Sequence, residues 1–310
     1  MDDAGADGRR SIGNDSAVAS GGDAIDPPES FRDGAVASDA GVYESFEREG
    51  PEAGGRAADL LDWEQPYETV LDDDDPPFYE WFPEGRLNAA VNCVDRHLDD
   101  RRNQLAIRWF GKRGERRSYT YLDLHREVNA LAAGLRDLGV GEDDVVTLYL
   151  PMVPELPIAM LACARIGAPH NVVFAGLSAE ALATRIDAAD SEYLITCDGY
   201  YRREDAFNQK SKADNARLRI DGDLRETVVV DRLGDALDVS LGGDEHAYDD
   251  LVDAHDGETV EPVARDATDL LFVMYTSGTT GRPKGVEHAT GGYLSQVAWT
   301  TRNVLAVRPD

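Results

Sequence analysis

Apolar residues recur with two different periods in the middle of the chain. The stretch 105–122, "LAIRWFGKRGERRSYTYL", is typical of two short strands around a glycine-containing turn. From Thr120 onward the apolar spacing lengthens to three or four residues, which predicts an amphipathic helix. Thr120 and Asp123 form a capping-box-like pair at its start, and Gly139 predicts its end.

The alternation of short apolar strands and helices continues toward residue 278. The segments that predict strands read "DVVTLYLP", "HNVVFAG", "EYLITCD", "ETVVVD" and "DLLFVMYTSG". Helices are predicted by "PELPIAMLACARIGA", which Gly167 ends, and by "SAEALATRIDAAD", which begins with a serine cap. Such alternation favours a parallel sheet that helices cover on both faces. The predicted fold class is therefore α/β, of the doubly wound type.

The N-terminal quarter has a different pattern. Residues 1–25 hold almost no large apolar side chain, so we expect a disordered acidic tail. Apolar residues return in short clusters over 26–77, which indicates a loosely packed helical arm. The run "DDDDPP", 72–77, is interpreted as a charged connector, and the compact body is expected to span 78–310.

Charge narrows the classes of partner. The chain of 310 residues carries 60 Asp and Glu against 31 Lys and Arg, a net charge of −29, and only four of the cations are lysines. Nucleic acid and anionic membranes are excluded as partners because their phosphates would repel such a chain. The same excess predicts a halophilic protein, since salt near 1 M shortens the screening length to about 3 Å and relieves self-repulsion.

Cysteine usage and hydropathy indicate the compartment. Cys93, Cys163 and Cys197 lack CxxC spacing, so we expect free thiols in a reducing compartment and no metal site. No secretory h-region and no apolar run of about eighteen residues is present, which predicts a cytoplasmic protein. Trp81 and Trp109 are interpreted as core side chains.

The residues most typical of chemistry lie near the end of the chain. The segment 275–285, "YTSGTTGRPKG", follows a predicted buried strand and combines three glycines, four Ser and Thr side chains and Lys284. Glycines allow a backbone to approach a ligand closely, and consecutive N–H groups, hydroxyls and a lysine suit the oxygens of a polyphosphate. Arg282 adds a second cation.

Composition alone leaves an alternative open for this segment. The common P-loop has Gly before its Lys and Ser or Thr after it, whereas Pro283 precedes Lys284 and Gly285 follows it. Gly, Ser and Thr are also ordinary residues of a flexible surface loop.

Longer stretches carry a resemblance to a known family. "YTSGTTGRPKG" resembles the phosphate-binding signature of the adenylate-forming superfamily. The segments "FYEWFPEGRLNAAVNCVDRHLD" (78–99), "LPMVPELPIAMLACARIGAPHNVVFAGLSAEAL" (150–182) and "HATGGYL" are similar to AMP-forming acetyl-CoA synthetases and their propionyl-CoA relatives. The resemblance covers roughly 26–310, and with the charge it indicates the haloarchaeal type.

The resemblance implies an activity and a set of site residues. Enzymes of this superfamily activate a carboxylate with MgATP as an acyl-adenylate and transfer the acyl group to coenzyme A. By position, the loop over the β- and γ-phosphates of ATP would comprise Thr276, Ser277, Gly278, Thr279, Thr280, Gly281 and Lys284. Arg202 corresponds to an arginine that contacts coenzyme A, and a surface arginine is an equal alternative. Asp205 stands where the family often has a second basic residue. The family's chemistry needs no histidine, so His97, His170 and His288 are expected to pack or cap.

The resemblance also implies what lies outside the chain. The family's acyl pocket, adenine site and small C-terminal lid with its catalytic lysine follow the phosphate loop by more residues than are present here. We therefore expect an incomplete AMP-binding domain over 78–310 that is inactive alone, and a possible complementing C-terminal half. The alternative is a non-catalytic remnant that a partner stabilises. Acetate, propionate and the oligomeric state stay undecided.

Overall fold

The computed structural model describes residues 28–37, 41–203, 205–276 and 283–308. The predicted tail 1–25 lies outside them. In chain order the helices are α1 (Glu29–Gly34), α2 (Gly41–Glu49), α3 (Ala53–Ala58), α4 (Ala89–Cys93), α5 (Leu98–Arg101), α6 (Tyr121–Asp137), α7 (Glu155–Arg165), α8 (Ala179–Ala188), α9 (Lys210–Arg217), α10 (Tyr248–Ala254) and α11 (Thr290–Asn303), with 3-10 turns at Gly50–Glu52, Asp95–His97 and Gly234–Ala236.

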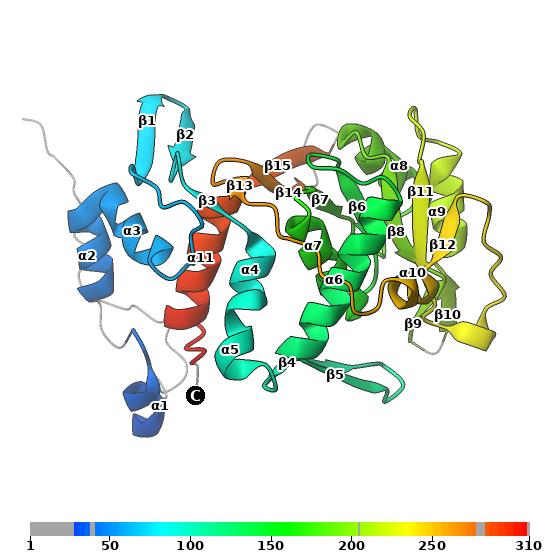
Figure 1. The fold of residues 1–310 in the computed structure, drawn as a ribbon, viewed down its shortest axis with the longest axis horizontal. Coiled ribbons are helices and arrows are strands. Elements are labelled where there is room, and N and C mark those ends of the chain that lie inside the picture. The colour runs from blue at the N-terminus through cyan, green and yellow to red at the C-terminus, as the bar shows by residue number, and fades with distance from the viewer. Residues whose placement is uncertain (1–27, 38–40, 204, 277–282, 309–310) are drawn as a thin grey trace, which may run out of the picture.

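A sheet of seven strands forms the centre of the molecule (Figure 1). Its spatial order is β12 (Glu245–Ala247), β11 (Glu226–Val230), β8 (Tyr193–Cys197), β6 (Val146–Tyr149), β7 (His170–Val172), β14 (Leu270–Thr276) and β15 (Lys284–Ala289). All neighbours pair in parallel except β14 and β15, which are antiparallel. The predicted α/β class with a mostly parallel sheet is confirmed.

Helices cover both faces of this sheet, and β8 shows why. Tyr193, Ile195 and Cys197 face the core under α6, α7 and α10, whereas Leu194 faces the core under α8 and α9. Alternate residues of a strand point to opposite faces, so a continuous apolar run serves both cores. This explains why the buried strands were visible in the sequence as unbroken apolar runs.

Helix α6 begins and ends as its sequence predicts. The Thr120 hydroxyl accepts a hydrogen bond from the Asp123 backbone N–H at 3.1 Å, and the Asp123 carboxylate accepts one from the Thr120 N–H at 2.9 Å. Gly139 follows the helix with φ of +92°, a left-handed conformation that glycine adopts without strain. The capping box and the terminal glycine are therefore confirmed.

The connector interpretation of "DDDDPP" is wrong. Leu71–Asp75 forms β1 and pairs antiparallel with β2 (Phe78–Trp81), so this acidic run is one strand of a hairpin that projects from the body in Figure 1. Four successive aspartates have no apolar period, and the strand exists because β2 supplies its partner. Trp81 lies on β2 with 38% of its surface exposed, so the prediction of a core residue is also wrong there.

Three further pairs of strands are short antiparallel ladders. They are β3 (Arg86–Leu87) with β13 (Arg265–Asp266), β4 (Leu105–Phe110) with β5 (Arg116–Thr120), and β9 (Gly199–Arg202) with β10 (Asp205–Asn208). The two strands predicted within 105–122 are confirmed as β4 and β5. Trp109 of β4 packs against the core under α6 and α7.

The run "NCVDRH", quoted above for its family resemblance, ties the arm to the body. The Asn92 side-chain amide bonds the backbone N–H and C=O of Asp62 at 2.8 and 2.9 Å. The Asp95 carboxylate forms an ion pair with the Arg165 guanidinium at 2.8 Å, and the Arg165 side chain is only 3% exposed. Arg96 donates to the Leu60 carbonyl at 3.0 Å. These side chains therefore hold α4 between the arm and α7.

Candidate phosphate-binding site

The two described ends of the glycine-rich segment face each other across a strand pair. Thr276 is the last residue of β14, Lys284 is the first of β15, and the two are register partners. The middle of β14 is buried, but Thr276 and Lys284 are exposed. The remaining predicted loop residues, Ser277, Gly278, Thr279, Thr280 and Gly281, lie outside the described residues.

Lys284 has the properties that an anion site needs. Its ammonium group has no carboxylate partner among the described residues, and β15 lies at the edge of the sheet, where a ligand has access. Gly285 pairs with Tyr275, and a Cβ at Gly285 would lie only 3.1 Å from Val273 Cγ2 and 3.2 Å from Tyr275 Cε1. The glycine therefore lets the Tyr275 ring lie close to the backbone beside Lys284.

A hollow of about 650 Å³ lies between the end of this segment and α8. Pro283 lines it together with Arg185, Glu180, Asp187 and Asp221. Burial raises the pKa of the Tyr275 hydroxyl, and the nearby positive charge of Arg185 opposes that rise. Arg185 was not among the site residues predicted from the sequence, because no motif includes it. Three carboxylates accompany its one guanidinium, so the hollow itself does not favour a polyphosphate.

A second cavity, of about 630 Å³, lies at the other end of β15. It is an open hollow between the arm, β2 and α11, and its lining includes Phe46, Trp81, His288 and Trp299. Among the described residues that line it there is no lysine or arginine, while Glu80 and Glu287 contribute carboxylates. This cavity suits apolar groups and not phosphates.

Arg202 lies in a different place from Thr276 and Lys284. It ends β9, is exposed, and is the register partner of Asp205 on β10. β9 follows β8, which is separated from β14 by β6 and β7 in the sheet, and the two regions lie far apart in Figure 1. Three steps of the usual strand spacing amount to roughly 15 Å. The structure therefore does not bring Arg202 to Thr276 and Lys284.

The surroundings of Arg202 hold cations that sequence analysis did not single out. Lys112, in the turn between β4 and β5, donates a hydrogen bond to the Arg203 carbonyl. The Arg113 guanidinium lies 3.8 Å from the centre of the Tyr201 ring. The sequence does contain a sign of this group, because basic residues are concentrated in 105–120, which is unusual in so acidic a chain.

The three histidines pack, as expected. His97 lies 4.7 Å from Tyr121 between ring centres, and Phe272 stacks on both His170 and His288. His170 is 2% exposed, neither ring nitrogen has a hydrogen-bond partner in the described structure, and burial lowers its pKa to about 4. A neutral imidazole enclosed in this way has no route to a substrate.

A mostly parallel sheet that helices cover on both faces, with a glycine-rich segment after β14, is typical of α/β proteins that bind nucleotides. The chain belongs to the AMP-binding enzyme family, whose description matches residues 94–310. A second family description, "Acetyl-coenzyme A synthetase N-terminus", matches residues 55–93.

Individual relatives support the same family. The chain is 45% identical to an acetyl-coenzyme A synthetase of Gemmatimonas aurantiaca over 92% of this chain and 44% of the relative. It is 42% identical to that of Mycolicibacterium smegmatis, over 93% of this chain and 30% of the relative. The solved acetoacetyl-CoA synthetase from Streptomyces lividans superposes with a TM-score of 0.78 at 27% identity, covering 88% of this chain and 42% of that one.

Two consequences follow from these comparisons. The chain spans less than half the length of these relatives. All three organisms are bacteria, so the haloarchaeal part of the sequence prediction receives no support. Separately, no helix within the described part of the chain combines the length and apolar character needed to cross a membrane.

Proposed function

We propose that this chain supplies the ATP-phosphate loop of an ATP-dependent acyl-CoA ligase that activates acetate or a similar short carboxylate. The register pairing of Thr276 with Lys284 carries the proposal, because it aligns a hydroxyl and an unpaired cation at the two ends of the glycine-rich segment. Acetyl-coenzyme A synthetases among the relatives favour acetate as the acyl group.

The loop would act by electrostatic stabilisation. MgATP enters as substrate, and attack of the carboxylate on the α-phosphorus places negative charge on the departing pyrophosphate. The Lys284 ammonium and the hydroxyls and N–H groups of Thr276, Ser277, Gly278, Thr279, Thr280 and Gly281 would bind that charge. Acyl transfer to the coenzyme A thiol would follow, with Arg202 as the proposed coenzyme A contact and Asp205 as an unfavourable neighbour for its phosphates.

Turnover is expected only with further polypeptide. Since the chain covers less than half of its relatives, we infer that a segment equivalent to the rest of them completes the adenylate site. Nucleotide binding by the chain itself is the part of the proposal that can be tested directly.

Calorimetric titration of MgATP and of pyrophosphate into the chain tests the loop. A charge-assisted hydrogen bond contributes about 1.5–3 kcal/mol, so Lys284→Ala should weaken binding of either ligand about tenfold or more. Lys212→Ala removes the same charge from α9, away from the segment, and should leave affinity unchanged. Equal affinities for the wild type and Lys284→Ala would reject the loop assignment.

A second candidate is a non-catalytic product that a partner stabilises. Apolar side chains on and after α11 favour it, since Val297, Val304 and Leu305 are 40%, 72% and 65% exposed. Exposed apolar groups in one region are typical of surfaces that bind another chain. Co-purification with a polypeptide equivalent to the rest of the relatives, without acetate-dependent exchange of pyrophosphate into ATP, would favour this candidate.

A further inference from the structure

Two hairpins of this chain carry opposite charge. The β1–β2 hairpin, 71–81, contains five carboxylates and no cation. The β4–β5 hairpin, 105–120, contains five cations and one carboxylate, in a chain whose net charge is −29. Composition alone would not lead one to expect two β-hairpins of opposite charge in the same chain.

Most of the charged side chains on both hairpins have no oppositely charged partner among the described residues. In the basic hairpin Glu115 pairs with Arg232 at 2.7 Å and Arg117 pairs with Glu155 at 2.8 Å. Among the described residues no carboxylate pairs with the other basic-hairpin cations, namely Arg108, Lys112, Arg113 and Arg116, and no cation pairs with the carboxylates of the acidic hairpin, namely Asp72, Asp73, Asp74, Asp75 and Glu80.

The basic hairpin presents two of these cations, Arg108 and Arg116, on its outer face. Trp109 and Arg117 are cross-strand partners on the inner face, where Trp109 packs against the core and the Arg117 guanidinium lies 5.1 Å from the centre of its ring. Phe110 and Arg116 are partners on the outer face, with Arg116 lying 5.6 Å from the centre of the Phe110 ring. Arg108 is on the outer face as well, by the alternation of side chains along β4.

Each hairpin also exposes aromatic surface. Phe78 and Tyr79 on the acidic hairpin are 73% and 56% exposed, and Phe110 on the basic hairpin is 61% exposed. Large exposed aromatic side chains are the residues that contribute most where proteins associate. Both hairpins therefore combine an apolar anchor with charges of a single sign.

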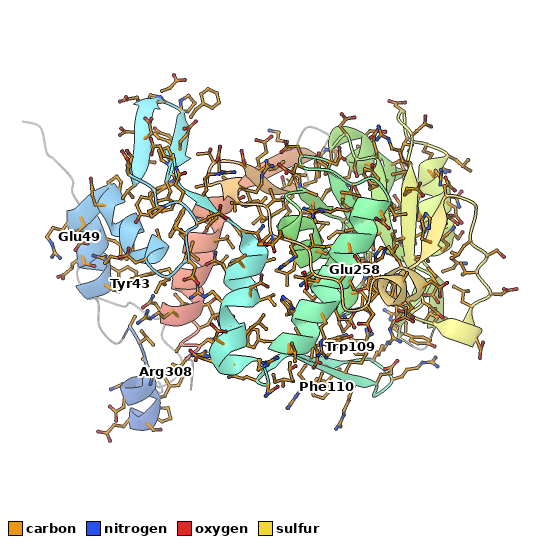
Figure 2. The ribbon with its side chains drawn as sticks, in the orientation of Figure 1. Tyr43, Glu49, Trp109, Phe110, Glu258 and Arg308 are labelled. Carbon is orange, nitrogen blue, oxygen red and sulfur yellow. The ribbon has the colours of Figure 1, made fainter. Side chains whose placement is uncertain are left out.

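The arrangement of the hairpins decides what kind of contact is possible. In Figure 1 the acidic hairpin projects from one corner of the molecule and the basic hairpin lies on the opposite side, where Figure 2 shows Trp109 and Phe110. They do not meet within one chain. Each is a two-stranded ladder with unpaired outer edges. Like charges prevent a hairpin from pairing with its own counterpart, whereas the opposite hairpin of another copy meets no such repulsion.

We propose that the acidic β1–β2 hairpin of one copy docks on the basic outer face of the β4–β5 hairpin of a second copy. The contact joins two different surfaces, so the association is head-to-tail and produces rings or open chains. Repulsion between two copies of net charge −29 opposes it, but at 0.15 M salt charges farther apart than about 8 Å are largely screened, whereas charges in contact are not. The proposal does not depend on nucleotide binding.

Sedimentation velocity over a range of chain concentrations, at the lowest KCl concentration that preserves the far-UV helix signal, tests the contact. Wild-type chain is expected to associate. Asp73→Lys/Asp74→Lys and Arg108→Glu/Arg116→Glu should each weaken association about tenfold or more, because two attractive pairs become repulsive. Arg219→Glu/Arg302→Glu changes the net charge as Arg108→Glu/Arg116→Glu does, but elsewhere on the surface, and should have no such effect.

Mixing the two hairpin variants distinguishes a direct contact from a folding defect. In an equimolar mixture, each remaining native hairpin meets its native partner and the two reversed hairpins also complement each other, so association should return to near the wild-type strength. If a charge reversal prevents folding, the neutral variants Asp73→Asn/Asp74→Asn and Arg108→Gln/Arg116→Gln replace it. They should weaken association by a smaller factor. A monomeric wild type, association that survives both reversals, or a mixture that fails to associate would overturn the proposal. A monomer that binds heparin through Arg108 and Arg116 would assign the basic face to a different polyanion.

Discussion

The buried ion pair between Asp95 and Arg165 allows a quantitative prediction. Arg165 Nη1 lies 2.8 and 3.1 Å from the two Asp95 carboxylate oxygens, and its Nε donates to the Val260 carbonyl at 2.6 Å. Asp95→Ala would leave a guanidinium whose side chain is 3% exposed with one carbonyl partner. Breaking a buried pair in this way costs about 3–5 kcal/mol.

The cost of Asp95→Ala in unfolding free energy is expected at the lower end of that range. The Asp95 side chain is 21% exposed, so water can reach the cation once the carboxylate is removed. We therefore expect Asp95→Ala to lower the free energy of unfolding by about 3 kcal/mol. Urea unfolding at constant KCl measures it: with a slope of about 3 kcal/mol/M for a chain of this size, the midpoint should fall by about 1 M.

Two variants control the measurement. Asp62 lies 3.7 Å from Arg96 with its side chain 60% exposed, so Asp62→Ala should change stability by no more than about 0.5 kcal/mol. Asp95→Ala/Arg165→Met removes the uncompensated charge and should recover most of the loss. If Asp95→Ala and Asp62→Ala cost the same, the reasoning from burial is refuted. A double variant less stable than Asp95→Ala would show that Arg165 contributes mainly through packing.

Three further predictions address protonation, capping and salt. The folded-state pKa of His170, about 4, lies below the ordinary value of 6.5, so stability should fall as pH decreases from 6.5 to 4, by up to about 3 kcal/mol. His170→Phe should flatten that part of a plot of urea midpoint against pH, and an unchanged slope would mean that other groups cause it. Thr120→Ala should cost about 1 kcal/mol in the same assay, because α6 loses its N-terminal cap, and no measurable loss would discount the capping box. Circular dichroism should show more helix in molar KCl than in dilute buffer if the net charge of −29 is an adaptation to salt, whereas equal signals would reject halophilic character.

Elements whose pattern is local were the ones that the sequence predicted well. α6 could be predicted from Thr120, a helical apolar period and Gly139, all of which lie within one segment. β6, β8 and β11 are short buried runs, which are readable because both faces of a parallel sheet demand apolar side chains. The acidic strand β1 had no such pattern, and its existence depends on pairing with β2.

Only part of the candidate site was accessible from the sequence. The motif identified Thr276 and Lys284, but their register pairing depends on how β15 folds back on β14. Arg185 comes near Tyr275 because of where the fold places α8, and nothing in its own segment marks it. Arg202 was identified from a resemblance, and the structure added that Lys112 and Arg113 lie beside it.

The sequence by itself determined the α/β class, the capped helices and the buried strands, and it marked the glycine-rich segment as the candidate site. Each of these is specified by residues that are neighbours along the chain, through periodicity or a short motif. The tertiary structure alone decided which charges meet and which remain unpaired. Asp95 and Arg165 are brought together across 70 positions, while the acidic and basic hairpins are kept on opposite sides of the molecule. Such long-range placement follows from how the elements pack on the sheet, which no local pattern records.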